Sequence, residues 1–264
     1  MGIWNRQTQS LNRNNTQQYE VFIPADKNGN LKNVEGHAAN IPLSEGLLSG
    51  YEDIHKFGYV DGTSTSPSTV WTADGLYPWD TVSGVLSVSS NDVGEVTTEV
   101  IVEGLDVNHN EISETFTISG TTTDVGTTTF LRVYRARVTG GDTNTGTIDV
   151  VRQGVTVGEI GAGFGQSLMG VFTIPAGKTG FMTSLEGSTS KAQASLVSLF
   201  ARELNGAFLV KSTVSLFQAA SSIEYSAPLR FPEKTDVEIR VIGTTNATVS
   251  ADFDLILVDN TVLV

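Results

Sequence analysis

Polar and apolar residues alternate along several short stretches between residues 84 and 154, which are rich in Val, Ile and Thr. Val96, Val100 and Val102, for example, lie at positions of one parity. A period of two is typical of strands that bury one face, and the breaks between the stretches contain Gly, Asn and Asp. We therefore predict a small antiparallel β-sandwich, with residues 51–157 as its domain.

The same alternation continues to the end of the chain. Its candidate strands cover 167–177, 178–188, 192–203, 207–218, 222–228, 235–244 and 248–259. Such a succession of short strands is typical of a jelly roll or a related sandwich, so we predict a jelly-roll-like domain at 158–264. The residues Gly158, Gly161, Gly163 and Gly165 predict a flexible link between the two domains, because Gly-rich segments carry few side-chain contacts. The predicted fold class is all-β.

Residues 1–50 differ from the rest, because they are rich in Asn and Gln and their apolar residues are too sparse for a core. Two interpretations stay open for this N-terminal extension. It is either a flexible terminus or an extended arm that becomes ordered only across a neighbouring subunit. Trp4 favours the arm, since an exposed Trp in a disordered tail forgoes a large amount of burial. We also expect a short helix after Pro42, with Ser44 as its N-cap.

The acidic charge of the chain argues against two classes of partner, nucleic acids and membranes. The 264 residues include 29 acidic and 16 basic side chains, a net charge of −13, and no Lys or Arg occurs between Phe57 and Leu131. Nucleic-acid binding depends on Lys and Arg that neutralise phosphates, and an anionic membrane repels an acidic surface. No apolar run approaches the roughly 20 residues of a membrane helix. We expect neither nucleic acid nor a membrane as a partner.

The residues that usually carry chemistry are scarce. The chain has no Cys, which excludes disulfides and thiolate metal sites, and its first residues lack the apolar core of a signal peptide. His37, His55 and His109 fall in separate segments without metal-ligand spacing. No nucleotide-binding loop or nucleophile motif is found, and carboxylate pairs are frequent in any acidic β protein. We expect a protein that folds in the cytoplasm and is not an enzyme, without cofactor, catalytic residue or metal ligand.

The segment from Asp106 to Asn110 imitates the start of a calcium-binding loop, with acceptor side chains at alternate positions. Glu111 stands where such a loop has Gly, and Thr117 stands where it has its distal Glu. We favour a β-turn between two strands, because Asp and Asn bond readily to their own backbone. A structural cation is the alternative.

Arg132, Arg135 and Arg137 are the first basic residues after the long acidic stretch. They suit ion pairs within the chain, or with the acidic face of a neighbouring subunit, because the planar guanidinium binds carboxylates through two nitrogens. Scattered surface pairs of little energetic value are the simpler interpretation. We include all three, with Trp4, among the candidate interface residues.

Trp71, Tyr77 and Trp79 form an aromatic group that supplies further interface candidates. Such residues commonly plug the end of a sandwich or anchor an interface between proteins. Stacked along a groove, they would instead hold a sugar. A glycan is therefore a possible ligand, although we favour it less than a protein partner.

Four stretches carry a resemblance to known proteins: 51–79 (YEDIHKFGYVDGTSTSPSTVWTADGLYPW), 104–123 (GLDVNHNEISETFTISGTTT), 130–138 (FLRVYRARV) and 171–183 (VFTIPAGKTGFMT). They resemble accessory virion proteins of tailed bacteriophages, particularly those common in marine and cyanobacterial phages. The first stretch is the most specific, and the last is a general feature of phage jelly rolls. The N-terminal extension lies mostly outside the resemblance.

The resemblance implies a virion component built from β-sandwich domains, with the major capsid or tail proteins as partners and no catalytic residues. We predict a capsid decoration (cement) subunit that stabilises the particle through contacts between subunits. It would assemble in the host cytoplasm as a homo-oligomer, for which we expect a trimer. A neck, tail or fibre subunit, or a carbohydrate-binding module that recognises the host surface, is the alternative.

Overall fold

The computed structural model describes residues 40–140, 143–190, 194–243 and 246–263. The chain divides into two compact units, Met1–Ser49 and Gly50–Val264. The arm predicted for residues 1–50 falls largely outside the described residues, and so does Trp4. All strands of the described residues belong to the second unit.

The first described element is the helix α1, Asn40–Ser44. It begins before Pro42, whereas the sequence predicts a helix after that residue with Ser44 as its cap. Proline is tolerated in a first helical turn, because the N–H group that it lacks would have no acceptor within the helix. Ser44 therefore ends this short helix and does not begin it.

The unit Gly50–Val264 is built from antiparallel strands, which confirms the all-β class. Its larger sandwich contains β1 Tyr51–Val60, β2 Ser68–Thr69, β10 Val171–Thr173, β11 Lys178–Thr189, β12 Ala194–Arg202, β13 Leu209–Phe217, β14 Ala220–Phe231, β15 Asp236–Gly243 and β16 Val249–Asp259. One sheet, the β1 sheet, has the order β1-β16-β11-β14. The other, the β12 sheet, has the order β10-β15-β12-β13, and β2 pairs with β15.

The larger sandwich has the strand order of a jelly roll. Leaving aside the short β2, the chain contributes eight strands in succession, β1 and then β10 to β16. The first, eighth, third and sixth of these form the β1 sheet, and the second, seventh, fourth and fifth form the β12 sheet. Two interleaved Greek keys of this kind define the eight-stranded jelly roll. The predicted jelly-roll-like architecture is therefore present.

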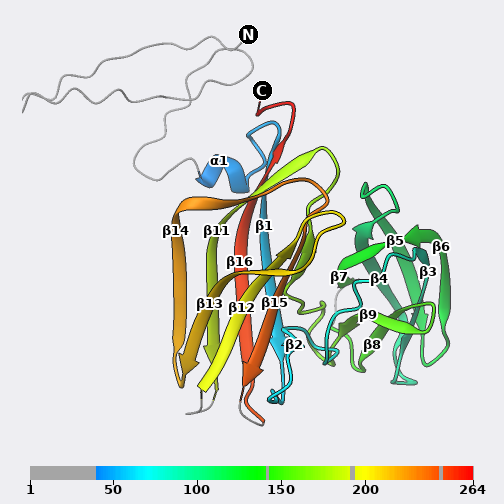
Figure 1. The fold of residues 1–264 in the computed structure, drawn as a ribbon. Coiled ribbons are helices and arrows are strands. Elements are labelled where there is room, and N and C mark those ends of the chain that lie inside the picture. Colours follow the sequence, from blue (N-terminus) through cyan, green and yellow to red (C-terminus); the bar gives the residue numbers. More distant parts are fainter. Residues whose placement is uncertain (1–39, 141–142, 191–193, 244–245, 264) are drawn as a thin grey trace, which may run out of the picture. The chain divides into compact units, whose positions relative to one another are not determined.

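The first strand of the jelly roll is far from the others in sequence. Strand β1 pairs with β16 along its length, from Tyr51 opposite Val258 to Val60 opposite Val249. Figure 1 shows the blue β1 beside the red β16. The predicted boundaries 51–157 and 158–264 consequently do not follow the sheets, because β1 belongs with the C-terminal strands. Alternation reports the burial of each strand but not its pairing partner, so the pattern alone does not reveal this arrangement.

A smaller sandwich is inserted between β2 and β10. Its strands are β3 Gly84–Ser90, β4 Val96–Leu105, β5 Glu111–Ser119, β6 Asp124–Phe130, β7 Arg132–Thr139, β8 Ile148–Arg152 and β9 Val155–Ile160. One sheet has the order β6-β3-β8-β9 and the other β5-β4-β7. Its core includes Leu86, Val100, Val102, Phe116 and Phe130. The antiparallel sandwich predicted for the middle of the chain is therefore found at residues 84–160.

The predicted Gly-rich link is an ordered part of the smaller sandwich. Gly158 lies inside β9, opposite Val150. The buried Asn144 donates from Nδ2 to the carbonyl oxygen of Gly161 at 2.9 Å, and its Oδ1 accepts the N–H of Gly165 at 2.9 Å. The N–H of Gly163 donates to the Asn144 carbonyl oxygen at 2.8 Å. A single buried amide thus fixes the turn that the composition alone predicts to be flexible.

Candidate functional site

The aromatic residues Trp71, Tyr77 and Trp79 lie where the two sandwiches meet. Trp71 and Tyr77 are each 3% exposed and Trp79 is partly buried. The ring centroids of Tyr77 and Trp79 are 4.6 Å apart. The Tyr77 hydroxyl donates to the carbonyl oxygen of Val133 at 2.8 Å and accepts the Val133 N–H at 3.1 Å. These side chains therefore join the segment after β2 to β7 of the smaller sandwich, and Trp71 and Tyr77 present no open face to a sugar.

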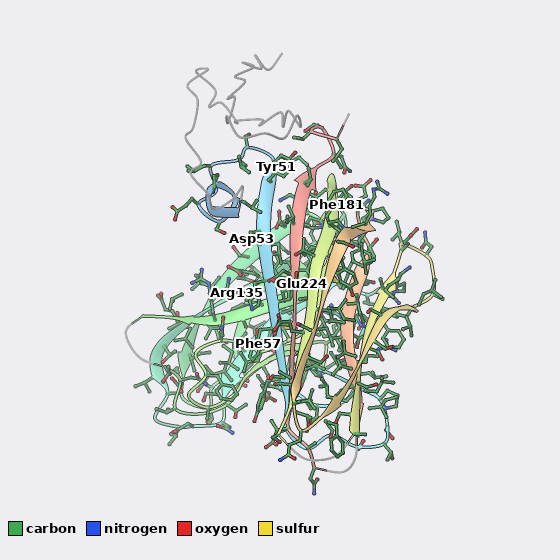
Figure 2. The ribbon with its side chains drawn as sticks, turned by 90° about the vertical axis from the view of Figure 1, so that its left-hand side faces the viewer. Tyr51, Asp53, Phe57, Arg135, Phe181 and Glu224 are labelled. Atoms are coloured by element: carbon green, nitrogen blue, oxygen red, sulfur yellow. The ribbon has the colours of Figure 1, made fainter. Side chains whose placement is uncertain are left out.

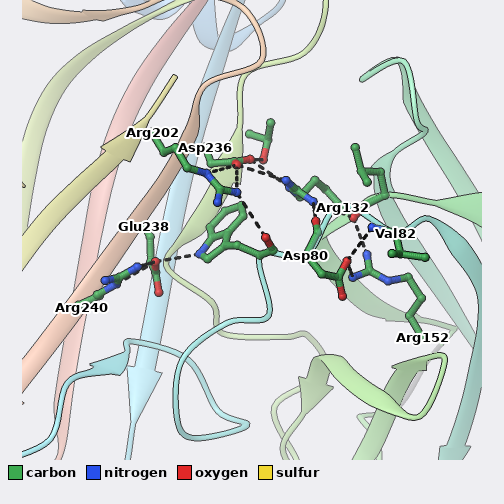
Figure 3. Close-up of polar contacts among 11 residues, drawn as sticks. Asp80, Val82, Arg132, Arg152, Arg202, Asp236, Glu238 and Arg240 are labelled. Atoms are coloured by element: carbon green, nitrogen blue, oxygen red, sulfur yellow. Dashed lines mark hydrogen bonds and ion pairs between the residues drawn. The ribbon is translucent and has the colours of Figure 1, made fainter. Parts of the chain in front are cut away.

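Beside the aromatic residues, an ion pair connects the two sandwiches (Figure 3). Arg132 of β7 donates from Nε to Asp236 Oδ1 at 3.0 Å and from Nη2 to Asp236 Oδ2 at 3.2 Å. Arg202 of β12 donates to Asp236 Oδ2 at 2.5 Å, and Thr173 donates to Asp236 Oδ1 at 2.7 Å. Arg132 and Asp236 are both buried. Asp236 therefore accepts hydrogen bonds from both sandwiches.

Two more ion pairs extend this network. Glu238, which is fully buried, accepts from Arg240 Nη2 at 2.7 Å and from Trp79 Nε1 at 2.8 Å. Arg152, also buried, donates to Asp80 Oδ1 at 2.5 Å. The network therefore runs from the jelly roll through the segment around Trp79 and Asp80 into the smaller sandwich.

Buried ion pairs of this kind fix geometry more than they add stability. Desolvation of both charges offsets much of their attraction, but removing one partner leaves the other charge buried and uncompensated. Because Arg132 donates through two nitrogens, its pairing with Asp236 also restricts orientation. The network therefore holds the two sandwiches in one arrangement.

The three sequence-predicted arginines have different environments. Arg132 is buried and forms its ion pair with Asp236 of the same chain. Arg135 and Arg137 of β7 lie 3.7 Å and 3.5 Å from carboxylate oxygens of Glu103, and both keep more than a third of their side chains exposed. Arg135 and Arg137 are thus placed to meet another molecule, and their role at an interface between subunits stays a prediction.

Opposed carboxylates lie on the smaller sandwich, where Asp149 of β8 is paired with Glu159 of β9. Burial, together with the negative charges of Asp149 and Asp74, raises the pKa of Glu159 to about 7. Burial likewise raises the pKa of Asp149. Both half-buried carboxyl groups therefore bind a proton more tightly than ordinary carboxyl groups do.

The segment from Asp106 to Asn110 forms the turn between β4 and β5, as the favoured interpretation predicts. Asp106 Oδ1 accepts the N–H groups of Asn108 and Asn110, each at 2.8 Å, and Asp106 Oδ2 accepts from the Asn110 side chain at 3.1 Å. These bonds lower the pKa of Asp106. In the described ranges, no group of three or more His, Asp or Glu side chains is arranged to hold a metal ion.

An apolar patch lies on the outer face of the β12 sheet. Leu196 and Ile242 are paired across β12 and β15 and are 39% and 42% exposed. Phe217 of β13 lies opposite Ala194, diagonally beside Leu196, and is 66% exposed. We call Leu196, Phe217 and Ile242 the β12 patch. Their neighbours in sequence, such as Val197 and Val241, point into the core, so the exposed residues occupy the opposite face of the same strands.

The outer face of the β1 sheet is acidic. It carries Asp252 and Asp254 of β16, opposite Glu186 of β11 and His55 of β1. His55 Nδ1 lies 2.7 Å from Asp254 Oδ1. Figure 2 looks onto this side and labels further carboxylates of this face, Asp53 and Glu224. The outer face of the β1 sheet is thus acidic, whereas the outer face of the β12 sheet combines the apolar β12 patch with the charged residues Glu238 and Arg240.

A cleft of about 550 Å³ lies between β1 and the smaller sandwich. Its lining includes Lys56 and Phe57 of β1, Glu103 of β4, and Tyr134 and Arg135 of β7. Strand β1 is an edge of its sheet, so it presents its unpaired side to this cleft. The cleft therefore combines side chains from both sandwiches with an open strand edge.

Sequence reasoning does not single out Asp236, Glu238, Arg202 or Arg240. A signal for three of them is present in the segment 236–241, where Asp, Glu and Arg alternate with Val and Ile. This places three charged residues on one face of a strand whose other face is buried. Charges in such a row indicate a buried network, but sequence does not show which arginine from elsewhere completes it.

No protein-family model matches the chain, and no curated protein matches it. Among solved structures, the chain is similar to the PBSX exported protein XepA, with 10% identity and a TM-score of 0.20 over 91% of this chain and 100% of that chain. It is also similar to the VP2 subviral particle of infectious bursal disease virus, with 10% identity and a TM-score of 0.22 over 85% and 78% of the two chains. At TM-scores this low, the similarities carry no argument about function.

Among the described residues, none of the helices has the length and apolar character needed to cross a membrane.

Proposed function

We propose that this chain is a structural protein of a phage particle, a capsid decoration subunit that stabilises the particle through contacts between subunits. The β12 patch is the observation that carries this proposal. The sequence resemblance of residues 51–79 and 171–183 to accessory virion proteins supports the placement in a phage particle.

The β12 patch suits contact with another protein. Single exposed apolar residues are common on any protein, whereas a contiguous group on a flat sheet face marks an interaction surface. Burial of such surface contributes roughly 25 cal/mol per Å² of apolar area removed from water. Association through Leu196, Phe217 and Ile242 would therefore stabilise an assembled shell.

The buried network between the sandwiches supports the same function. A subunit that stabilises a particle must hold its contact surfaces in a fixed arrangement, since flexible surfaces lose entropy when they bind. Arg132, Asp236 and Arg202 supply this fixation between β7 and the jelly roll. The half-exposed Arg135 and Arg137 then offer charged contacts at a separate place on the same rigid unit.

The partners in this proposal are other virion proteins and further copies of this chain. A closed homo-oligomer, with a trimer as the expected form, would repeat the same contact around one axis. The N-terminal arm with Trp4 would lie across a neighbouring subunit. The acidic outer face of the β1 sheet would keep the assembled protein soluble.

A neck, tail or fibre subunit is the nearest alternative, because the same surfaces serve any lattice of subunits. A carbohydrate-binding module built on Trp71 and Tyr77 loses its support, because both side chains are buried. Glycan binding that disappears with Trp79→Ala, while the fold is retained, would restore that alternative.

Molecular mass in solution tests the proposal. We expect the full chain to form a discrete oligomer in analytical ultracentrifugation, and we expect Leu196→Lys with Ile242→Lys to dissociate it. Val85→Lys with Val125→Lys is the matched control, since both valines are exposed on neighbouring strands of the smaller sandwich. Circular dichroism verifies that each variant is folded.

Three outcomes separate the parts of the proposal. A full chain that is monomeric at all concentrations, and that does not sediment with purified phage heads, contradicts assembly. Dissociation by the control pair as strongly as by the test pair removes the β12 patch as the interface. A variant that lacks residues 1–39 tests the arm, and unchanged association would exclude a contribution from it.

A further inference from the structure

Lys56 has an unusual environment for a lysine. It is 8% exposed and lies on β1, and its Nζ donates to the carbonyl oxygen of Tyr134 on β7. Within the described part of the chain, this carbonyl is its one hydrogen-bond acceptor, and no carboxylate forms an ion pair with it. An ammonium has three N–H donors, so a buried one with a single neutral acceptor is poorly compensated.

The groups around Lys56 come from three strands. Arg135 of β7 and Glu103 of β4 line the same cleft from the smaller sandwich, His55 precedes Lys56 on β1, and Asp53 of β1 lines the cleft three residues away. Burial, together with the charge of Arg135, lowers the pKa of Lys56 to about 7, while the charge of Glu103 acts in the opposite direction. The burial of Lys56 therefore lowers its pKa by more than the charge of Glu103 raises it.

The cleft that Lys56 lines is large enough for a small ligand. Its volume of about 550 Å³ falls in the usual range for such sites. It contains the hydrogen-bonding side chains of Glu111 and Gln166 together with the aromatic rings of Phe57 and Tyr134. An open cleft with a buried, poorly compensated ammonium and several polar groups is typical of a binding site.

The mixture of groups defines the chemistry of the ligand. A carboxylate would give Lys56 the anion that it lacks, and Arg135, although it already lies 3.7 Å from Glu103, would add a second positive charge to the site. Glu103, Glu111 and Asp53 would repel a phosphate or sulfate dianion, whereas they would accept hydrogen bonds from hydroxyl groups. Phe57 and Tyr134 would contact the apolar face of a sugar ring.

We infer that the cleft between β1 and the smaller sandwich binds a small acidic saccharide, of the uronic acid type, whose carboxylate pairs with Lys56. This inference does not rest on the β12 patch, which is the observation that carries the proposed assembly function. The β12 patch and the cleft share no residue, so each is tested without the other.

Nuclear magnetic resonance titration of the full chain with sodium glucuronate tests the inference, with glucose and sodium sulfate as the comparison ligands. Glucuronate is expected to shift amide resonances of residues 53–57 and 134–135 and to bind more tightly than glucose or sulfate. Lys56→Met is expected to weaken this binding by about tenfold or more, because a charge-assisted hydrogen bond is lost. This variant is expected to fold, since an apolar side chain replaces a buried charge.

The matched control is Lys211→Met, which removes an exposed lysine of β13 and should leave glucuronate binding unchanged. Binding by the unmodified chain should weaken roughly tenfold from pH 6 to pH 8, because the protonated fraction of Lys56 falls in this range. This dependence should vanish in Lys56→Met, which separates Lys56 from His55.

Several results would overturn the inference. They are absence of glucuronate binding, equal binding of glucose, tighter binding of sulfate, or unchanged affinity in Lys56→Met. A pH dependence that persists in Lys56→Met would assign the effect to His55 and would likewise contradict the role of Lys56. None of these results bears on the oligomeric state of the protein.

Discussion

Asp236 of β15 and Arg132 of β7 form a two-point ion pair, with an Nε–Oδ1 distance of 3.0 Å and an Nη2–Oδ2 distance of 3.2 Å. The two residues belong to different sandwiches, and both are almost fully buried. Their pairing shows how a chain with an inserted domain keeps the insertion in a fixed position. Asp236 also binds Arg202 of its own sandwich, so one carboxylate serves both sides of the junction.

Arg132→Met is expected to destabilise the protein by about 3–5 kcal/mol, because Asp236 is left buried with less compensation. The free energy of unfolding in urea measures this change. Arg137→Met is the control, and it should cost under about 1 kcal/mol because the Arg137 side chain is more than a third exposed. Similar losses in the two variants would show that the Arg132 pair has no special importance.

Tyr77→Phe is expected to lower the free energy of unfolding by about 1–3 kcal/mol. The variant keeps the ring contacts with Trp71 and Trp79 but removes both hydrogen bonds to the Val133 backbone. Thermal unfolding provides the measurement. Tyr59→Phe, on a ring that packs edge-on against Phe164, serves as the comparison and should have a smaller effect. A stability of Tyr77→Phe equal to that of the unmodified protein would contradict the role of this hydroxyl.

Glu159→Gln is expected to change the pH dependence of stability. The folded protein raises the pKa of Glu159 from 4.5 to about 7, so it binds a proton more tightly than the unfolded chain does. The contribution of this group to stability is therefore complete below pH 4.5 and is lost as the pH rises through 7. Since Gln does not ionise, the variant should gain stability relative to the unmodified protein between pH 4.5 and pH 7.

Urea unfolding at pH 4.5, 6 and 8 measures this difference for Glu159→Gln. The gain should be smaller than the full pKa shift implies, because the half-buried carboxyl is screened by solvent. Glu203→Gln, at an exposed position after β12, should follow the pH profile of the unmodified protein. Parallel profiles for Glu159→Gln and the unmodified protein would contradict the raised pKa of Glu159 in the folded protein.

Asn144→Ala is expected to loosen the turn at residues 161–165. The variant loses the bonds from Nδ2 to Gly161 and Gly146 and the bond from the Gly165 N–H to Oδ1. Amide hydrogen exchange should accelerate at Gly165, where the lost acceptor leaves the N–H unprotected. Asn108→Ala, in the exposed turn between β4 and β5, is the control and should not change exchange at Gly165. Unchanged protection in Asn144→Ala would mean that the backbone alone holds the turn.

Much of the local structure follows from the sequence. The predicted strands at 178–188 and 248–259 correspond closely to β11 and β16, and those at 192–203 and 235–244 contain β12 and β15. The alternation in these segments records which side chains are buried, and burial on one face is a property of each strand by itself. The predicted turn at Asp106 also follows from local chemistry, because its acceptors and donors lie within five residues.

The candidate sites depended more strongly on the tertiary structure. The sequence identified Arg132, Trp71 and Tyr77 as residues with a special role but left open whether they serve the chain or a partner. Their burial between the sandwiches shows that they make contacts within the chain, whereas Arg135 and Arg137 stay partly exposed. The alternation of residues along β7 does not distinguish the buried Arg132 from the exposed Arg135 and Arg137. The residues that bury Arg132 come from strands far away in sequence.

By itself, the sequence determined the all-β class, the position of most strands and the presence of a jelly-roll-like region, because the spacing of apolar residues encodes the burial of each strand. Only the tertiary structure decided that β1 pairs with β16, that residues 84–160 form an insertion, and that Lys56 lines a cleft. These features are contacts between segments separated by many residues. Such contacts depend on which surfaces pack together, and a pattern with a period of two carries no information about that choice.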